Sequence, residues 1–501
     1  MIGEQQRWQE DLFVAAPLRD LIPDDHILKR VDRVLDLAWL RDEVRACYHE
    51  SIGRPGIDPE AAMRLMLAGL FHGIVHDRKL MREAQVNLAI RWFAGYRLTD
   101  RLPHHSSLTR LRQRWGPQRF ERVFKQSVQA CAEAGLVDGE TVHIDATLIR
   151  ADVSWQSLTE RHVEAVLAEN EPPGDDHDAN GGGEARGEEE QAAPARRSRG
   201  RPHTRPKKKR KKKEKVKKVS RTDPEATMAT SSRNQRMEPC FKQHTAVDDR
   251  LGVIVDVCIT TGEASEGQQL EAQLDRIEAN TRTSVRHVTA DAAYAHARNY
   301  SAIEDRKAEA VIPPQREATR RGRIPARRFT YDDHHKVVRC PRRKILRPSS
   351  RPDEQSTLYR ARARDCKVCP LRARCIAPTA TARVIRIADG HPALLRARRR
   401  HARGEITESE LYRRHRWRAE GVHGEAKSQH GLRRAARRGL ANMSVQAYLT
   451  AAVMNLKRLA ASAFGCASIR RLVRRVAGAM TRWRSIVARF TRITTAARLA
   501  A

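Results

Sequence analysis

The sequence predicts an α/β protein with a mixed sheet, preceded by an all-α region and interrupted by a cysteine-containing insertion. Three observations lead to this expectation. An alternating apolar and polar pattern at 140–155 predicts a strand, and a strand–turn–strand pattern follows at 240–267. Helical and strand patterns then alternate over 267–314. A charge-rich helix, predicted within 409–440, closes the domain.

The composition indicates a nucleic-acid partner. The chain has 501 residues and a formal net charge of +35, so we expect it to bind a polyanion, with nucleic acid as the default. An anionic membrane surface is the weaker alternative, because no apolar run approaches the ~20 residues of a spanning helix. The nine cysteines are unevenly spaced, and the first residues lack a signal-peptide pattern. We therefore expect a cytoplasmic, nucleoid-associated protein with reduced thiols or metal ligands.

Residues 1–137 are expected to form a helical N-terminal DNA-binding domain. Asp58 and Pro59 are placed as N-cap and first residue of a helix over 58–74. A short basic helix at 106–116 and a second helix at 117–136 follow. The basic helix carries Arg110, Arg112 and Arg114. Short helices joined by tight turns suggest a helix-turn-helix-like DNA reader; the alternative is an all-α packing domain whose arginines face water.

A carboxylate stands in the middle of the first predicted strand. Val142 and Ile144 alternate with polar residues, so Asp145 projects to the face opposite the apolar residues. Because strands disfavour aspartate, the position needs an explanation. A metal ligand is one explanation, and a strand with a solvated polar face is the other.

Residues 165–220 are expected to be a disordered linker, acidic first and then basic. The basic tract at 196–218 holds Glu214 as its single acid. Such charge runs repel themselves and cannot bury a core. The tract should add salt-dependent affinity for phosphates, and its Arg-Gly-Arg-Pro sequence at 199–202 suits an A·T minor groove.

The middle of the chain supplies a second carboxylate. Residues 242–259 predict a hairpin that turns at 248–252, and 267–280 predict a helix. The pattern at 284–314 then predicts strand, helix and strand, with Asp291 at the end of the first strand. Open α/β sheets place ligand-binding groups at this position. The alternative role for Asp291 is to cap the following helix, and both roles are compatible.

The third carboxylate lies on the helix within 409–440. Arg416, Glu420 and Lys427 are spaced by four and seven residues, which puts them on one stripe. An exposed helix with ordinary ion pairs would show the same spacing. The order of elements nevertheless matches an RNase H-like catalytic domain made of 138–164, 221–314 and the helices of 406–465. Carboxylates on two strands and a helix can converge on two divalent cations, which Mg²⁺ (or Mn²⁺) suits.

The chain resembles the DDE-type transposases of bacterial insertion sequences, in the branch with a Tyr-Arg-Glu-Lys signature. The resemblance rests on HIDATLIRADVS (143–154), TDPEATM (222–228), FKQHTAVDDRLGVIVDV (241–257), VTADAAY (288–294) and the region 412–457. It assigns the three family acids to Asp145, Asp291 and Glu420, with Arg416 and Lys427 in the signature spacing. Tyr412 stands one residue before the signature position. Glu425 is the rival acid, but it lies about 140° around the helix from Glu420.

This resemblance implies a transposase that binds the terminal inverted repeats of its element and cuts DNA with two metal ions. It would then join 3′-OH ends to target DNA, as a homodimer or larger assembly on double-stranded DNA and without a membrane. One alternative is a non-catalytic DNA-binding remnant that acts as a repressor. Another is an RNase H-like nuclease that cannot join strands.

The insertion at 315–405 carries a group of cysteines. They are Cys340, Cys366, Cys369 and Cys375. Four thiols with one Cys-x2-Cys pair suit a structural Zn²⁺, while an iron–sulfur cluster and free thiols are the other interpretations. The resemblance implies such a cluster without deciding its metal. The last residues, 466–501, are expected to form a basic amphipathic helix that contacts DNA or a partner.

Overall fold

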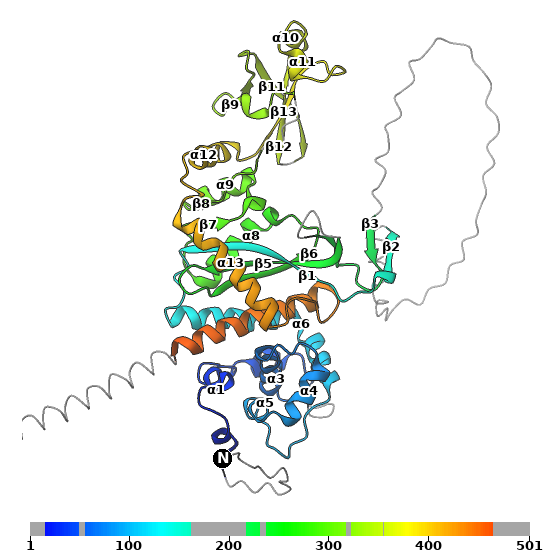
Figure 1. Cartoon of the computed structure of the whole chain (residues 1–501), viewed down its shortest axis with the longest axis vertical. Helices are drawn as coiled ribbons and strands as arrows, with labels where there is room; N and C mark the ends of the chain where they lie inside the picture. Colours follow the sequence, from blue (N-terminus) through cyan, green and yellow to red (C-terminus); the bar gives the residue numbers. More distant parts are fainter. Residues whose placement is uncertain are drawn as a thin grey trace, which may run out of the picture.

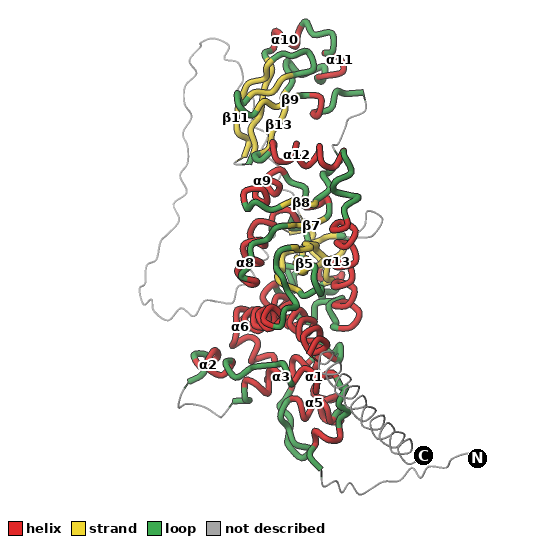
Figure 2. The backbone as a smooth tube through the Cα atoms, turned by 90° about the vertical axis from the view of Figure 1, so that its left-hand side faces the viewer, coloured by secondary structure: helices red, strands yellow, loops and turns green. Residues whose placement is uncertain are grey.

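The computed structural model describes residues 16–49, 56–161, 217–230, 237–316, 322–353 and 355–463. Its parts are stacked along one axis, with the N-terminal helices at one end, a mixed sheet in the middle and a second sheet at the other end (Figure 1). Figure 2 shows the same order from the side. Nearly all of the predicted linker at 165–220, and the predicted helix at 466–501, lie outside the described residues.

The N-terminal region is helical, as the sequence predicts. Asp58 caps α3 by accepting a hydrogen bond from the backbone N–H of Ala61, and Pro59 is its first residue. Helix α6 breaks at Gly116, where φ is 67°, so the two predicted helices meet there. The elements are η1 (Leu18–Leu21), α1 (Ile27–Asp32), α2 (Leu40–Arg45), α3 (Pro59–Phe71), α4 (Asp77–Val86), α5 (Leu88–Phe93) and α6 (His105–Glu133).

Arg112, which the sequence pattern assigns to a DNA-facing basic helix, is buried instead. Its guanidinium donates to both carboxylate oxygens of Asp77 on α4, at 2.7 and 2.9 Å. Arg437, from the segment after α13, donates to the same carboxylate at 2.7 Å. The physical reason is helical spacing, because Arg112 shares a face with the buried Leu108 and Trp115. Arg110 and Arg114 are exposed, so they alone of the three fit the prediction.

The central sheet is mixed. Its strand order is β4-β5-β1-β7-β8, with β6 also paired to β5. β1 runs antiparallel to β5 and parallel to β7, while β6 is antiparallel to β5 and β8 is parallel to β7. The predicted hairpin is therefore confirmed as β5 and β6. The strands are β1 (Thr141–Arg150), β4 (Thr227–Ala229), β5 (Glu238–Asp248), β6 (Ile254–Thr261), β7 (His287–Ala290) and β8 (Glu309–Val311).

Helices cover both faces of this sheet. On one face, Thr289 of β7 bonds both His143 of β1 and His415 of α13. On the opposite face, Asp256 of β6 accepts two 3.0 Å hydrogen bonds from Arg276 of α8, and α6 packs on α8. The helices of this region are α8 (Leu270–Thr281), α9 (Ala297–Asp305) and α13 (Glu410–Gln429). The arrangement is compatible with an α/β nuclease-like domain.

A further helix at 440–463 packs between two hydrophobic cores. Met443 and Ala447 belong to the core of the sheet, while Val445 and Leu449 belong to the core of the N-terminal helices. The sequence predicts a helix that covers the sheet; in the structure it also joins the sheet to the N-terminal region. Asn455 fixes it by donating to the carbonyl of Ile254 and accepting from its N–H, both at 2.9 Å.

The insertion contains an antiparallel sheet with a small core of its own. Its strands are β9 (Thr330–Asp332), β10 (Val337–Arg339), β11 (Ile345–Asp353), β12 (Ser356–Ala361) and β13 (Val384–Ala388), and its helices are η5 (Ala326–Arg328), α10 (Ala363–Lys367) and α11 (Arg372–Cys375). α12 (His391–Ala402) returns the chain to α9. A short pair, β2 (Leu158–Arg161) and β3 (Lys217–Ser220), follows η2 (Trp155–Ser157). Within the described residues, no helix is both long and apolar enough to span a membrane.

Replacing Asp77 by alanine is expected to destabilise the fold by about 3–5 kcal/mol, because it leaves the buried Arg112 charge without a partner. Chemical denaturation would measure the loss. Asp42→Ala is the matched control, since Asp42 and its partner Arg45 are both 75% exposed and such pairs contribute about 0–1 kcal/mol. Equal losses in the two variants would contradict this account.

Candidate active site

The parallel pairing of β1 with β7 brings two predicted acids together. The register ends with Ile144 opposite Ala290, and the next residues along the two strands are Asp145 and Asp291. Because β7 stops there and β1 continues to Arg150, no described strand pairs with the far half of β1 on that side, where Arg150 alone forms a bridge, to Arg434. A cavity of about 860 Å³ lies over this edge and is lined by both acids.

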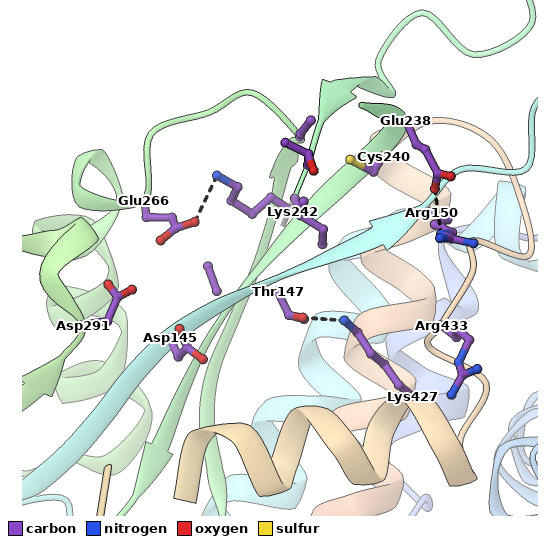
Figure 3. A pocket seen from close by; sticks show the side chains of 15 residues that line it. Asp145, Thr147, Arg150, Glu238, Cys240, Lys242, Glu266, Asp291, Lys427 and Arg433 are labelled. Carbon is purple, nitrogen blue, oxygen red and sulfur yellow. Dashed lines mark hydrogen bonds and ion pairs between the residues drawn. The ribbon is translucent and has the colours of Figure 1, made fainter. Parts of the chain in front are cut away.

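Basic residues surround the other side of this cavity. Asp145, Asp291 and Glu266 lie on one side, and Lys427, Arg433 and Arg150 lie on the other (Figure 3). Lys427 donates to the hydroxyl of Thr147 on β1 at 2.6 Å. A cavity with acidic side chains on one side and basic side chains on the other can bind a metal cation and a phosphate group at the same time.

The two acids differ in their electrostatics. Burial raises the pKa of Asp291 to about 6, and the charges of Glu266 and Asp145 add to this effect, against a hydrogen bond from the N–H of Ala293. Burial also opposes ionisation of Asp145, but His423, the N–H of Ala146 and His415 together outweigh it and lower the pKa of Asp145. The Nδ1 atom of His423 lies 3.4 Å from the Asp145 carboxylate. Carboxylates with divergent pKa values in one pocket are typical of a functional site.

Glu420 is not among the residues that line the cavity. Its side chain is 64% exposed, and its carboxylate lies 3.4 Å from Nε of Arg416, which is 82% exposed. Its backbone nevertheless lies on the same stripe of α13 as Lys427 and is three residues before His423. The structure thus brings Asp145, Asp291 and Lys427 together, while Glu420 and Arg416 face solvent beside them.

Glu425 faces away from the cavity, as expected for the rival acid. It is 19% exposed and accepts hydrogen bonds from Lys457 at 2.8 Å and Arg458 at 3.1 Å, both from the helix at 440–463. Burial alone would raise its pKa, but His430 and these cations lower it to about 2. Glu425 therefore anchors α13 to the neighbouring helix.

Tyr412, whose role the sequence leaves open, lies on the sheet-facing side of α13. Its ring stacks on His415, with centroids 6.1 Å apart. Burial raises the pKa of Tyr412, and the charge of Asp291 adds to the increase. The tyrosine therefore lies within electrostatic reach of the cavity although it stands one residue early in the signature.

Sequence reasoning missed a buried polar chain that holds α13 on the sheet. The Thr289 hydroxyl lies 3.0 Å from Nδ1 of His415 and 2.6 Å from Nδ1 of His143. The other ring nitrogen of His143 lies 2.9 Å from Asp249. Burial lowers the pKa of His143, and that of His415 to about 4, so both rings are neutral at pH 7. The sequence feature that could have indicated these contacts is His143, because it is a second polar residue on the face of β1 that carries Asp145.

Glu266 and Lys242 were also missed as residues of the cavity. They form an ion pair at 3.2 Å in its wall. Lys242 stands in a strand and Glu266 in a short turn, η3 (Glu266–Gln268), and neither position has a spacing that distinguishes it from ordinary surface charge.

The predicted cysteines gather at one end of the insertion. Cys340, Cys366 and Cys375 pack against the same small core. Burial raises the pKa of the Cys375 thiol, and the three other thiols contribute to the increase. As the side chains stand, no group of three or more His, Cys, Asp or Glu in the described part of the chain is arranged to hold a metal ion. The predicted zinc site therefore remains a prediction.

The donor chemistry of the cavity still fits a hard divalent cation. Carboxylate oxygens are the ligands that Mg²⁺ and Mn²⁺ prefer. In addition, the hydroxyl of Tyr294 is fully buried and has no hydrogen-bond partner among the described residues. Burial raises its pKa, and the charges of Glu266, Asp145 and Asp291 raise it further.

Two family models match the chain. A model described as "Transposase domain (DUF772)" matches residues 16–114, and one described as "Transposase DDE domain" matches residues 339–460. The two matches support a DDE-type transposase of insertion sequences. The second match includes Glu420 and the insertion cysteines, whereas Asp145 and Asp291 lie outside both matches. No curated protein matches the transposase.

Asp291→Asn is expected to stabilise the metal-free transposase at pH 8. Because the pKa of Asp291 is raised to about 6 in the folded protein, its contribution to stability is present below pH 4 and is lost as the pH rises to 6. Asparagine carries no charge and can still accept from Ala293. The gain should be about 1–2 kcal/mol after allowance for solvent screening of a partly exposed group.

Thermal unfolding in EDTA at pH 8 and pH 4 would measure this effect. The gain should disappear at pH 4, where both proteins are uncharged at this position. Asp305→Asn, at an exposed acid of α9, is the control. A loss of stability at pH 8 would contradict the assignment of Asp291 to a crowded acidic site.

Proposed function

We propose that the transposase cuts DNA at the ends of its element and joins the resulting 3′-OH ends to target DNA, with Asp145, Asp291 and Glu420 as metal ligands. The observation that carries this proposal is the pairing of Asp145 with Asp291 at the ends of adjacent parallel strands. The cavity beside them is bordered by Lys427 and Arg433, which suit a DNA phosphate.

The sheet supports an RNase H-like assignment of the catalytic domain. Three strands, β6, β5 and β1, are antiparallel neighbours, and two shorter strands, β7 and β8, continue the sheet in parallel. α13 then crosses the face that bears Asp145. This is the order of elements expected from the sequence for two strand-borne acids and one helix-borne acid.

Within this proposal, the residues of the chain orient the reacting groups. A bound pair of divalent cations, Mg²⁺ or Mn²⁺, supplies Lewis-acid stabilisation and an activated oxygen nucleophile in sites of this kind. His423 orients the carboxylate of Asp145, and the N–H of Ala293 orients that of Asp291. Lys427, held by Thr147, presents a positive charge to a phosphate at the edge of β1.

Glu420 would join the site by giving up its ion pair with Arg416 and binding the metal ion instead. Its carboxylate is held in solvent by Arg416, through an exposed pair of the kind that contributes little to stability. A DNA phosphate at Arg416 would compete for that guanidinium and free Glu420 to turn toward Asp145. The helix itself need not move, because His423 already joins α13 to Asp145 on the same stripe.

DNA binding outside the cavity is assigned to the N-terminal helices. Arg110 and Arg114 are exposed on α6, and Arg114 lies over the ring of Tyr48. Arg112 is excluded from this role, because it is buried against Asp77. We assign recognition of the terminal inverted repeats to this surface, and we expect the transposase to assemble as a homodimer or larger complex on double-stranded DNA.

Glu420→Gln and Asp145→Asn are expected to lower Mg²⁺-dependent cleavage of the element ends by about a thousandfold or more, because each removes a charged ligand. The assay uses a plasmid carrying the inverted repeats that flank the gene. Glu410→Gln, at an acid of α13 that is 82% exposed, is the control and should cleave normally.

Cleavage by Glu420→Gln at the wild-type rate would refute the assignment of Glu420. Pre-cut ends separate the remaining possibilities. A transposase joins them to target DNA, a nuclease that cannot join strands leaves them unchanged, and a non-catalytic repressor binds the repeats without Mg²⁺-dependent cleavage.

For the insertion, we propose that Cys340, Cys366, Cys369 and Cys375 hold a structural Zn²⁺. Support comes from the packing of Cys340, Cys366 and Cys375 against one small core, and from the effect of the three other thiols on the pKa of Cys375. Small closing movements of the thiols would complete the site.

Full-length protein purified under reducing conditions is expected to contain about one equivalent of zinc. The Cys366→Ser, Cys369→Ser double variant should lose this zinc and unfold at a lower temperature. Cys47→Ser, at an isolated cysteine of the N-terminal region, should keep it. Elemental analysis decides the question, and wild-type protein without zinc, or with iron in its place, would contradict the proposal.

A further inference from the structure

The cavity contains an acid that the three-acid assignment does not use. Glu266 lines the same cavity as Asp145 and Asp291 and comes from a third element, the turn η3 (Figure 3). It is 23% exposed. Among the charges that act on Asp291, that of Glu266 has a larger effect than that of Asp145. Because it lines the cavity and is mostly buried, Glu266 belongs to the wall of the site and is not a surface acid near it.

The turn that carries Glu266 is fixed against the turn that follows Asp291. The carbonyl of Gly267 accepts a 2.9 Å hydrogen bond from the side chain of Asn299, which also donates to the carbonyl of Tyr294 at 2.8 Å. A Cβ at Gly267 would lie 2.0 Å from the ring of His296, so only glycine permits this approach. η3 thus packs directly on η4 (Ala292–Tyr294), and Glu266 and Asp291 are held as neighbours by backbone contacts.

Lys242 forms an ion pair with the carboxylate of Glu266. Nζ of Lys242 lies 3.2 Å from Glu266 and donates to the carbonyl of Ala264 at 2.8 Å, and its side chain is 13% exposed. The ammonium group of Lys242 offsets one of the negative charges of the acids that line the cavity. The hydroxyl of Tyr294 is buried without a hydrogen-bond partner in the described part of the chain, and Tyr294 belongs to η4, on which η3 packs.

We propose that Glu266 is a fourth acid of the metal site and binds, together with Asp291, the same divalent cation. This inference rests on the proposed function of the cavity. Lys242, which pairs with Glu266, would compete with the cation for this carboxylate. When the cation binds, Lys242 gives up Glu266 and keeps its hydrogen bond to the carbonyl of Ala264.

The test is Mn²⁺ binding to the full-length protein without DNA, measured by calorimetry and by the free-Mn²⁺ electron paramagnetic resonance signal. Glu266→Gln should weaken Mn²⁺ binding by about tenfold, because it removes a charged ligand without changing shape. The melting temperature in EDTA should stay the same or rise, since repulsion around Asp291 decreases. Lys242→Met should strengthen Mn²⁺ binding about two- to fivefold, because it removes the competing cation.

Glu271→Gln, at an exposed acid in the first turn of α8, is the matched control and should bind Mn²⁺ as the wild type does. Unchanged Mn²⁺ affinity in Glu266→Gln would overturn the inference. So would a drop in its melting temperature in EDTA with no loss of affinity, which would indicate a purely structural role.

Asp145→Asn separates this inference from the function on which it rests. If Asp145→Asn weakens Mn²⁺ binding and Glu266→Gln does not, the inference fails and the proposed metal site stands. If neither variant weakens binding, the proposed metal site itself fails.

Discussion

The site depends on the register of two parallel strands. Ile144 and Ala290 are fully buried partners, and their packing in the core fixes the position of the residues that follow. Asp145 and Asp291 are therefore held side by side by backbone pairing, not by an attraction of their own. Burial raises the pKa of Asp291 to about 6, and repulsion from the charges of Glu266 and Asp145 adds to the increase. A fold that maintains such a contact is poised to bind a cation.

The helix α13 is the second constraint, because it brings the remaining charges to the same edge. One side of the helix is held on the sheet by the contact of His415 with Thr289, and another side is anchored by the ion pairs of Glu425. With two sides occupied, the stripe of Glu420 and Lys427 is left outside these contacts, with Lys427 lining the cavity and Glu420 exposed to solvent. The exposed pair of Glu420 with Arg416 is then the part of the helix that DNA can rearrange at the lowest cost.

The strands and caps of this fold could be predicted from local patterns. Alternation around Asp145, the hairpin near 248–252 and the cap at Asp58 are short-range signals, and each agrees with the structure. Local signals could not predict the burial of Arg112. A charged residue on a predicted helix is expected to be exposed unless its distant partner is known, and the partner of Arg112 is Asp77. Glu266 and the chain from Asp249 to His415 were missed for the same reason. Their contacts join segments that lie far apart in sequence.

The central claim is that Asp145 and Asp291 share a divalent cation, and the position of that cation tests it most directly. Anomalous X-ray scattering from Mn²⁺ in crystals of the full-length transposase bound to its terminal repeat would locate the ion. The account predicts an anomalous peak between the carboxylates of Asp145 and Asp291, with Glu420 turned toward it. A Mn²⁺ peak elsewhere, with these carboxylates bonded only to protein groups, would contradict the account.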